Sequence, residues 1–230
     1  MSDGKRIFLG VRVSVATANA LAQCAETLAR RAKDAGLDVA WAVPTSYHVT
    51  LKFLGWTRDD AIAAVCDAAG AALAGAAPFR FRTARLGAFP SLEQASVLWA
   101  GVEDGKALGE LAARLEPAMV ALGFAAEPRP FVPHVTLGRL RQTRPVRDVV
   151  LPMSEQMFSE TRVDVVSLYE SETKPTGSVY REVAKIDLDR PPLARSEAEK
   201  RQTGALELGD ELQEPETDDG WPRGEPVREI

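Results

Sequence analysis

Alternating hydrophobic and polar positions predict seven strands along this chain. Between residues 6 and 15 every second side chain is apolar, as expected for a strand with one buried face. The same period of two predicts the other strands, at 47–54, 79–87, 95–102, 134–140, 162–170 and 179–187.

Apolar positions three or four residues apart predict three helices between these strands. Thr17 or Asn19 is expected to cap the first helix, and Pro117 is expected to kink the third. The helices are predicted over 17–36, 57–75 and 107–123. Helices mixed with strands in this way indicate an α+β or α/β fold.

Composition and charge divide the chain into a body and a tail. With 230 residues, of which 45% are hydrophobic and 27% charged, the chain matches a globular protein of one domain or two small lobes. Most of the net charge of −5 lies in residues 189–230, which carry 12 acidic and 6 basic side chains. Since this proline-rich segment lacks apolar periodicity, we expect one domain over residues 1–190 and a disordered tail over 191–230.

Several features of the sequence are typical of a cytoplasmic protein. Arg12 interrupts the first apolar run, which argues against a secretory signal, and later apolar runs are too short to cross a membrane. Cys24 and Cys66 are too few for a disulfide framework and fall in helical patterns, where a free thiol usually acts as a small buried side chain. We therefore predict a reducing compartment.

An internal repeat is the most informative feature of the sequence. The only two histidines, His48 and His134, each open the tetrapeptide His-Val-Thr-Leu, and the two copies lie 86 residues apart. By composition alone, threonine and leucine would stand at these offsets from both histidines about 3 times in 100,000. The repeat therefore predicts two related halves.

On a strand, the repeat brings a histidine and a threonine together. A period of two places His48 and Thr50 on one face, about 7 Å apart, with the valine and leucine of the motif on the buried face. Thr136 lies likewise beside His134, and Lys52 shares the face of the first histidine. Each histidine could instead be a half-buried residue on a polar sheet face, but the duplication favours imidazoles and hydroxyls that converge in a cleft.

Two histidines and two threonines suit displacement at phosphorus. One neutral imidazole can take a proton from water while the other, protonated, donates to the leaving oxygen, and the hydroxyls can donate to phosphate oxygens. A metal site is disfavoured because neither motif supplies a third ligand. Nucleophilic catalysis is disfavoured because the sequence has no Gly-x-Ser-x-Gly segment and both cysteines fall in helical patterns. We therefore expect neither a metal nor a cofactor.

Arg139 is the strongest candidate for matching the negative charge of a phosphate. Strict alternation places it on the face opposite His134, but Gly138 directly before it allows a bulge that turns it toward the histidine. The alternative is a solvated arginine at a strand end. The arginines within 80–85 and 139–147 would either follow an RNA backbone or form a solvated edge.

The paired motifs resemble those of the 2H phosphoesterase superfamily, and the surrounding sequence is similar to its RNA 2',3'-cyclic phosphodiesterase branch, also called 2'-5' RNA ligase. The resemblance covers about residues 5–188 and includes the segments 131–139 and 168–171. It implies an α+β fold of two pseudo-symmetric lobes, each an antiparallel sheet backed by helices, with the two motifs in a central cleft.

The resemblance also implies a reaction, the metal-independent hydrolysis of RNA 2',3'-cyclic phosphate ends to 2'-phosphates, together with reversible 2'-5' RNA ligation, in which a 5'-hydroxyl replaces water. His48 would be the proton donor and His134 the proton acceptor. Thr50 and Thr136 would hold phosphate oxygens. The expected substrates are RNA, including tRNA fragments, or nucleotides that carry a 2',3'-cyclic phosphate, and the protein is expected to be a monomer with no membrane partner.

Two alternatives stay open at the level of sequence. A 2H phosphodiesterase acting on small cyclic nucleotides or on 2'-5' oligoadenylate would keep this chemistry and change the pocket. A non-catalytic RNA-binding module would not need two titrating imidazoles. Turnover of a 2',3'-cyclic nucleotide in the presence of EDTA distinguishes catalysis from binding alone.

Overall fold

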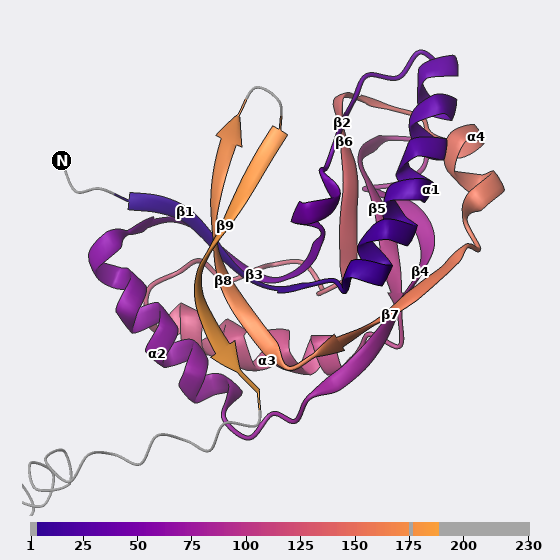
Figure 1. Cartoon of the computed structure of the whole chain (residues 1–230). Coiled ribbons are helices and arrows are strands. Elements are labelled where there is room, and N and C mark those ends of the chain that lie inside the picture. Colours follow the sequence, from indigo (N-terminus) through magenta and orange to yellow (C-terminus); the bar gives the residue numbers. More distant parts are fainter. Residues whose placement is uncertain (1–3, 175–176, 189–230) are drawn as a thin grey trace, which may run out of the picture. The chain divides into compact units, whose positions relative to one another are not determined.

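The computed structural model describes residues 4–174 and 177–188, so the tail expected over 191–230 lies outside the described residues (Figure 1). Its strands are β1 (Gly4–Arg12), β2 (Val39–Trp41), β3 (His48–Arg58), β4 (Phe79–Phe89), β5 (Ala95–Glu103), β6 (His134–Arg144), β7 (Met157–Val163), β8 (Val165–Lys174) and β9 (Gly177–Asp187). They form one antiparallel sheet in the order β7-β4-β5-β6-β3-β1-β8-β9, with β2 also paired to β6. The α+β prediction with antiparallel sheets is confirmed.

Helices and short 3-10 turns connect the strands. The helices are α1 (Val15–Asp34), α2 (Ile62–Leu73), α3 (Lys106–Ala121) and α4 (Arg147–Val150). The 3-10 turns are η1 (Pro44–Ser46), η2 (Asp59–Ala61) and η3 (Leu151–Met153). None of the helices in the described part of the chain is long and apolar enough to span a membrane.

The strand order is symmetric about its centre. There, β3 and β6 meet through the single pair Val49 and Val135. Outward from β3 follow β1, β8 and β9, which we call the β3 half, and outward from β6 follow β5, β4 and β7, which we call the β6 half. The chain order repeats as well, because β1-α1 leads to β3 as β5-α3 leads to β6.

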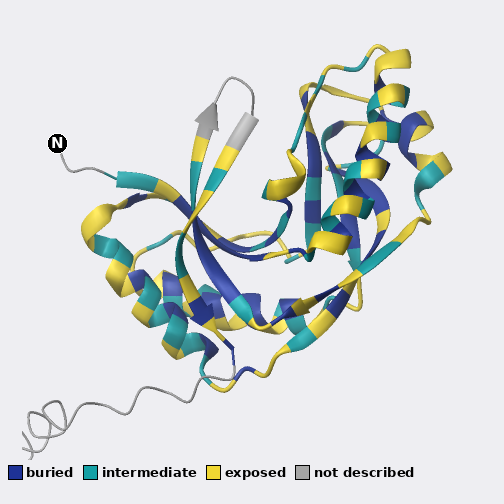
Figure 2. Ribbon diagram, in the orientation of Figure 1, coloured by how far each residue is buried: buried dark blue, intermediate teal, exposed yellow. Residues whose placement is uncertain are grey.

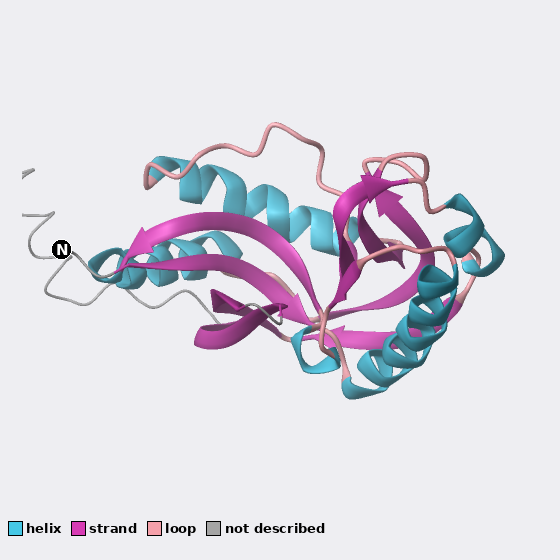
Figure 3. Ribbon diagram, turned by 90° about the horizontal axis from the view of Figure 1, so that it is seen from above, coloured by secondary structure: helices cyan, strands magenta, loops and turns pink. Residues whose placement is uncertain are grey.

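The helices of the two repeats are exchanged between the halves. The helix α1 follows β1 but contacts β7, whereas α3 follows β5 but packs on β3 beside α2 (Figures 1 and 3). At the start of α1, the Ser14 amide donates to the hydroxyl of Thr161 in β7 at 3.0 Å. The exchange joins both halves in one hydrophobic core cluster, and Figure 2 shows buried residues along the middle of the strands and on one side of the helices.

The structure corrects several predicted boundaries. The first helix begins earlier, because Ser14 is its N-cap and accepts a hydrogen bond from the Thr17 amide at 3.2 Å. The second helix begins later, because pairing with β1 extends β3 to Arg58. The sequence analysis missed β2, which has only three residues. It also missed β7, in which buried and exposed side chains alternate only over the last three residues. Pro117 lies inside α3.

Candidate active site

The two His-x-Thr motifs meet where β3 and β6 pair. Because the valines of the two motifs lie opposite each other in an antiparallel register, His48 lies opposite Thr136. In the same register Thr50 lies opposite His134. Directly opposed side chains on one face have Cβ atoms about 4.5–5.5 Å apart. The valines are fully buried in the core, while these four side chains, which we call the quartet, are half-buried on the other face.

A β-bulge in β6 turns Arg139 to the face of the quartet. Two consecutive residues of β5 pair with Thr136 and Gly138, so Leu137 is the extra residue of the bulge. The bulge thus lies one residue earlier than the glycine that was expected to allow it. Arg139 is exposed, and its charge contributes to the lowered pKa of both His48 and His134. No carboxylate among the described residues forms an ion pair with it.

The equivalent bulge in β3 makes the prediction for Lys52 wrong. Two consecutive residues of β1 pair with Thr50 and Lys52, so Leu51 is the extra residue and the alternation shifts. Lys52 therefore points into the core, on the face opposite the first histidine, and is 4% exposed. Its ammonium group pairs with the Glu116 carboxylate at 2.8 Å and donates to the Ala125 carbonyl oxygen at 2.7 Å.

An aromatic cluster surrounds His48. The imidazole stacks on Phe8 with ring centroids 4.6 Å apart and meets Tyr180 edge to face at 4.9 Å. Gly10 leaves room for this packing, since a Cβ there would lie 3.3 Å from Cε2 of Phe8 and 3.5 Å from Cδ2 of His48. The sequence analysis missed these neighbours. Phe8 could have been found, because it is an aromatic residue on the strand face where the period of two places polar side chains.

His134 has a smaller aromatic environment, which the sequence analysis also missed. Phe89 of β4 meets its ring edge to face, with centroids 4.9 Å apart. Trp99 of β5, the direct partner of Thr136, lies at 6.5 Å. Both contacts come from strands far from the motif in sequence, so no local pattern could have indicated them.

Both imidazoles are oriented by the same kind of hydrogen bond. Nδ1 of His48 lies 2.7 Å from the Ser46 carbonyl oxygen. Nδ1 of His134 lies 2.7 Å from the Val132 carbonyl oxygen. Because a carbonyl oxygen can only accept, each Nδ1 carries a proton and each neutral ring presents the lone pair of Nε2. Nε2 of His48 is 3.1 Å from the Thr50 hydroxyl, which donates to it in this tautomer.

Burial lowers the pKa of both imidazoles. Desolvation is the largest cause for His48 and lowers its pKa to about 4, with smaller contributions from the positive charges of His134, Arg12 and Arg139, while the Ser46 carbonyl opposes the shift. Desolvation is also the largest cause of the lowered pKa of His134. Both rings are therefore neutral at neutral pH, and a bound anion would raise both pKa values.

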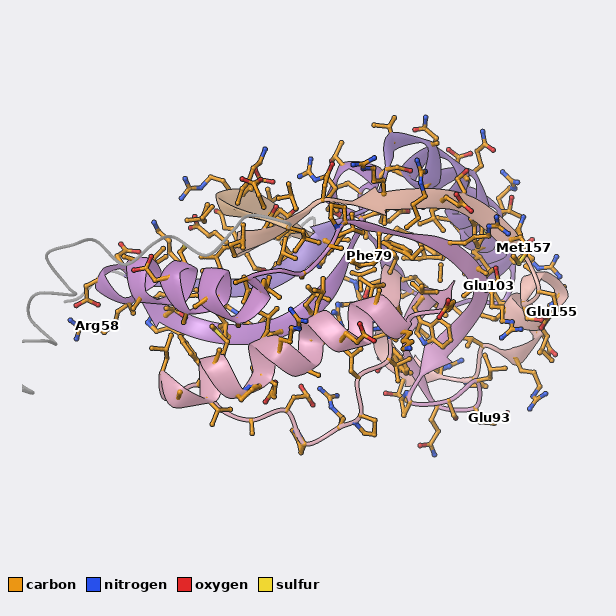
Figure 4. All side chains as sticks on the ribbon, turned by 90° about the horizontal axis from the view of Figure 1, so that it is seen from below. Arg58, Phe79, Glu93, Glu103, Glu155 and Met157 are labelled. Carbon is orange, nitrogen blue, oxygen red and sulfur yellow. The ribbon has the colours of Figure 1, made fainter. Side chains whose placement is uncertain are left out.

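The basic segments singled out in the sequence are largely paired with carboxylates. Arg82 lies 2.8 Å from Glu160, and Arg147 lies 2.7 Å from Glu93. Figure 4 shows Glu93 at the outer surface of the β6 half. These contacts favour the solvated-edge interpretation for both arginines.

The two cysteines lie in helices, as predicted. Cys24 of α1 is free and buried, and desolvation raises its pKa to about 11. Cys66 of α2 is free and half-buried. Within the described ranges, no group of three or more His, Cys, Asp or Glu side chains could hold a metal ion.

The family model and the related proteins that match this chain agree with one another. Residues 20–175 match the family model of the 2'-5' RNA ligase superfamily. The RNA 2',3'-cyclic phosphodiesterase of Geobacillus stearothermophilus is 33% identical over 182 residues, which cover 77% of this chain and 56% of that protein. The RNA 2',3'-cyclic phosphodiesterase of Methanothermobacter thermautotrophicus is 29% identical over 181 residues, covering 77% of this chain and 96% of that protein.

Solved structures share the fold. The crystal structure of TT0787 of Thermus thermophilus superposes with a TM-score of 0.66 at 25% sequence identity, covering 80% of this chain and 98% of that one. The chain thus spans about half the length of the Geobacillus relative and nearly the whole length of the other two proteins.

Proposed function

Because the chain belongs to the 2'-5' RNA ligase superfamily, whose family model matches residues 20–175, we propose that it is a metal-independent phosphodiesterase that hydrolyses RNA 2',3'-cyclic phosphate ends to 2'-phosphates. The observation that carries this proposal is the quartet, two imidazoles and two hydroxyls on one sheet face at the junction of the halves. The names of the Geobacillus and Methanothermobacter relatives support the same activity.

The diagonal arrangement of the quartet suits an in-line displacement. Each imidazole lies opposite a threonine, so the two rings stand at opposite corners of the quartet, where they would flank a phosphate bound at its centre. In such a displacement water attacks phosphorus on the side opposite the leaving 3'-oxygen, so one group must take a proton on one side while another donates on the other. The two corners meet this requirement.

His134 acts as the base and His48 as the acid in this proposal. The Nε2 lone pair of His134 takes a proton from water while the water oxygen bonds to phosphorus. The bond between phosphorus and the 3'-oxygen breaks, and His48 gives its Nε2 proton to that oxygen. The low pKa of His48 in the free protein means that the phosphate must raise it on binding, after which the buried imidazolium is a strong proton donor.

The remaining groups stabilise the charge of the transition state. Thr50 and Thr136 donate their hydroxyl hydrogens to the phosphate oxygens that do not leave. Arg139 faces both imidazoles and supplies the positive charge for the oxygens on which negative charge accumulates. With a 5'-hydroxyl in place of water, His134 would take the proton of that hydroxyl and His48 would again protonate the leaving 3'-oxygen, so the same groups in the same roles would form a 2'-5' bond.

These residues all lie within residues 1–190, which we propose as the catalytic domain of a cytoplasmic monomer. The natural substrates in this proposal are RNA fragments with 2',3'-cyclic phosphate ends, such as those of tRNA.

The test is turnover of cytidine 2',3'-cyclic phosphate in the presence of EDTA. We expect cytidine 2'-phosphate as the product, with the rate unaffected by the chelator. A His48→Ala variant, shown to be folded by circular dichroism, should lose the activity. Loss of turnover in EDTA with recovery on addition of a divalent ion would contradict the metal-free mechanism, and a fully active variant would contradict the role of the quartet.

A further inference from the structure

A row of aromatic and basic side chains continues from the quartet along the β3 half. Phe8 pairs with Phe53 across β1 and β3, and Arg6 pairs with Trp56. Directly paired residues project from the same face, and Arg6 and Phe8 are two residues apart on one strand, so all four side chains share a face. Because Phe8 stacks on His48, this is the face of the quartet.

Three of these side chains, Arg6, Phe53 and Trp56, are exposed, and we call them the stacking row. Phe53 is 47% exposed and Trp56 is 69% exposed. The guanidinium carbon of Arg6 lies 5.4 Å from the centroid of the Phe53 ring. No carboxylate among the described residues forms an ion pair with Arg6. Such a positive charge beside two exposed aromatic rings is the combination that binds single-stranded nucleic acid.

The backbone holds the Trp56 ring in place. The indole lies on Gly4, because a Cβ there would come within 2.8 Å of its Nε1 and 2.9 Å of its Cε2. A tryptophan with one side on the backbone and most of its surface in solvent presents a fixed flat surface. Arg58, two residues further along β3, pairs with Asp60, and Figure 4 shows it at the outer end of the β3 half. The stacking row therefore leads away from the quartet.

The far end of the stacking row lies more than one nucleotide away from His48. On β1, Arg12 lies opposite His48 and Arg6 lies opposite Trp56, six residues further along the strand. Six residues of a strand span about 20 Å. A terminal nucleotide with its phosphate at the quartet would thus have the nucleotides before it within reach of the row. Their phosphates would meet the charges of Arg6 and Arg12.

We propose that the stacking row binds the nucleotides that precede the cyclic phosphate of a single-stranded RNA. The bases stack on Phe53 and Trp56, and Arg6 contacts the backbone phosphate between them, so binding does not depend on base identity. The chain consequently prefers oligonucleotide ends to free cyclic mononucleotides. This inference rests on the proposed function, whose substrate class it narrows.

The test measures binding of a fluorescent single-stranded hexanucleotide that ends in a 2'-phosphate, the reaction product, so that no turnover is needed. Trp56→Ala is expected to raise the Kd about 5- to 100-fold, the range for loss of one stacked base. Trp56→Phe should retain most of the affinity. Leu122→Ala removes another exposed apolar side chain, 42% exposed at the end of α3, and should keep the wild-type Kd. Equal Kd values for the wild-type chain and Trp56→Ala would overturn the inference.

Turnover provides a second measurement that separates the two proposals. For Trp56→Ala, kcat/KM for the hexanucleotide 2',3'-cyclic phosphate should fall relative to kcat/KM for the cyclic mononucleotide, and an equal loss for both would overturn the inference. If the wild-type chain turns over neither substrate, the proposed function fails, and the Kd comparison still decides the stacking row. Dimerisation without RNA that Trp56→Ala abolishes in sedimentation would assign the row to a second copy instead.

Discussion

The β3 half and the β6 half carry the same motif in different surroundings. Each has a His-x-Thr pair, a bulge at the following leucine and a carbonyl oxygen that accepts from Nδ1 of the histidine. Five residues after the histidine, however, the β3 half has Phe53 and the β6 half has Arg139. The stacked aromatic rings around His48 continue as the stacking row in the β3 half, whereas the β6 half offers a cation with no carboxylate partner among the described residues.

This difference teaches how a duplicated motif can serve an asymmetric reaction. Two identical imidazoles in identical surroundings would titrate together, and neither would be set apart as acid or base. The apolar side of the quartet suits the nucleoside and the leaving oxygen, and the cationic side suits the phosphate charge. The surroundings, rather than the motif, therefore distinguish the two corners.

Among the changes that test the two halves, removal of either histidine should have the largest effect on kcat. His48→Ala and His134→Ala should each lower kcat by about 10²- to 10⁴-fold, because each loses a proton-transfer group. On a substrate with sulfur in place of the leaving 3'-oxygen, the defect of His48→Ala should shrink, since a thiolate leaves without a proton. The defect of His134→Ala should stay. The rates of product formation with the oxygen and sulfur substrates measure both defects. If the defect of His134→Ala shrank instead, His134 would be the acid and His48 the base.

Arg139 tests the charge difference between the halves. Arg139→Met should lower kcat/KM by about 10- to 100-fold, the equivalent of one charged hydrogen bond to the phosphate. Arg141→Met is the matched control on the same strand, because Arg141 lies 3.2 Å from Asp38 and should be nearly neutral when replaced. Steady-state kinetics with a cyclic mononucleotide give both values. Similar losses in the two variants would mean a general effect of charge.

The depressed pKa of His48 should appear in the pH dependence of stability. The unfolded chain binds a proton at a pKa of about 6.5, whereas the folded chain does so only at about 4, so stability is complete above 6.5 and falls as the pH decreases through this window. Between pH 7 and pH 5 this loss amounts to about 2 kcal/mol. Urea unfolding at both pH values should show a smaller loss in His48→Gln. An equal loss of stability in His48→Gln would mean that a group other than His48 takes up the proton.

Substitution of Lys52 tests the core beneath the β3 half, and its effect, on the free energy of unfolding, should be the smallest of the four. Lys52→Met removes the buried ammonium from Glu116, whose carboxylate is 32% exposed, and should lower the free energy of unfolding by about 1–2 kcal/mol. Arg80→Met, which breaks a surface pair with Glu160, is the control and should change stability by less than about 0.5 kcal/mol. Urea unfolding measures both. A Lys52→Met chain as stable as the wild type would show that this ion pair adds nothing to the fold.

Local patterns in the sequence predicted many of the features that the structure and the comparisons confirm. The alternation along β1 indicated its buried face, and Ile7, Leu9 and Val11 are at most 2% exposed. The repeated His-Val-Thr-Leu indicated two related halves, and the family match confirms the resemblance drawn from it. These properties follow from neighbouring residues, because a strand's two faces depend only on its period of two.

The tertiary structure decided everything that depends on partners distant in the chain. The faces of Lys52 and Arg139 depend on bulges, and a bulge exists only relative to the strand paired beside it. The low pKa of His48 depends on desolvation by its surroundings, which include Tyr180 on β9, 132 residues away in sequence. The exchange of α1 and α3 between the halves has the same origin, since a periodic apolar face indicates that a helix is buried but not against which strands.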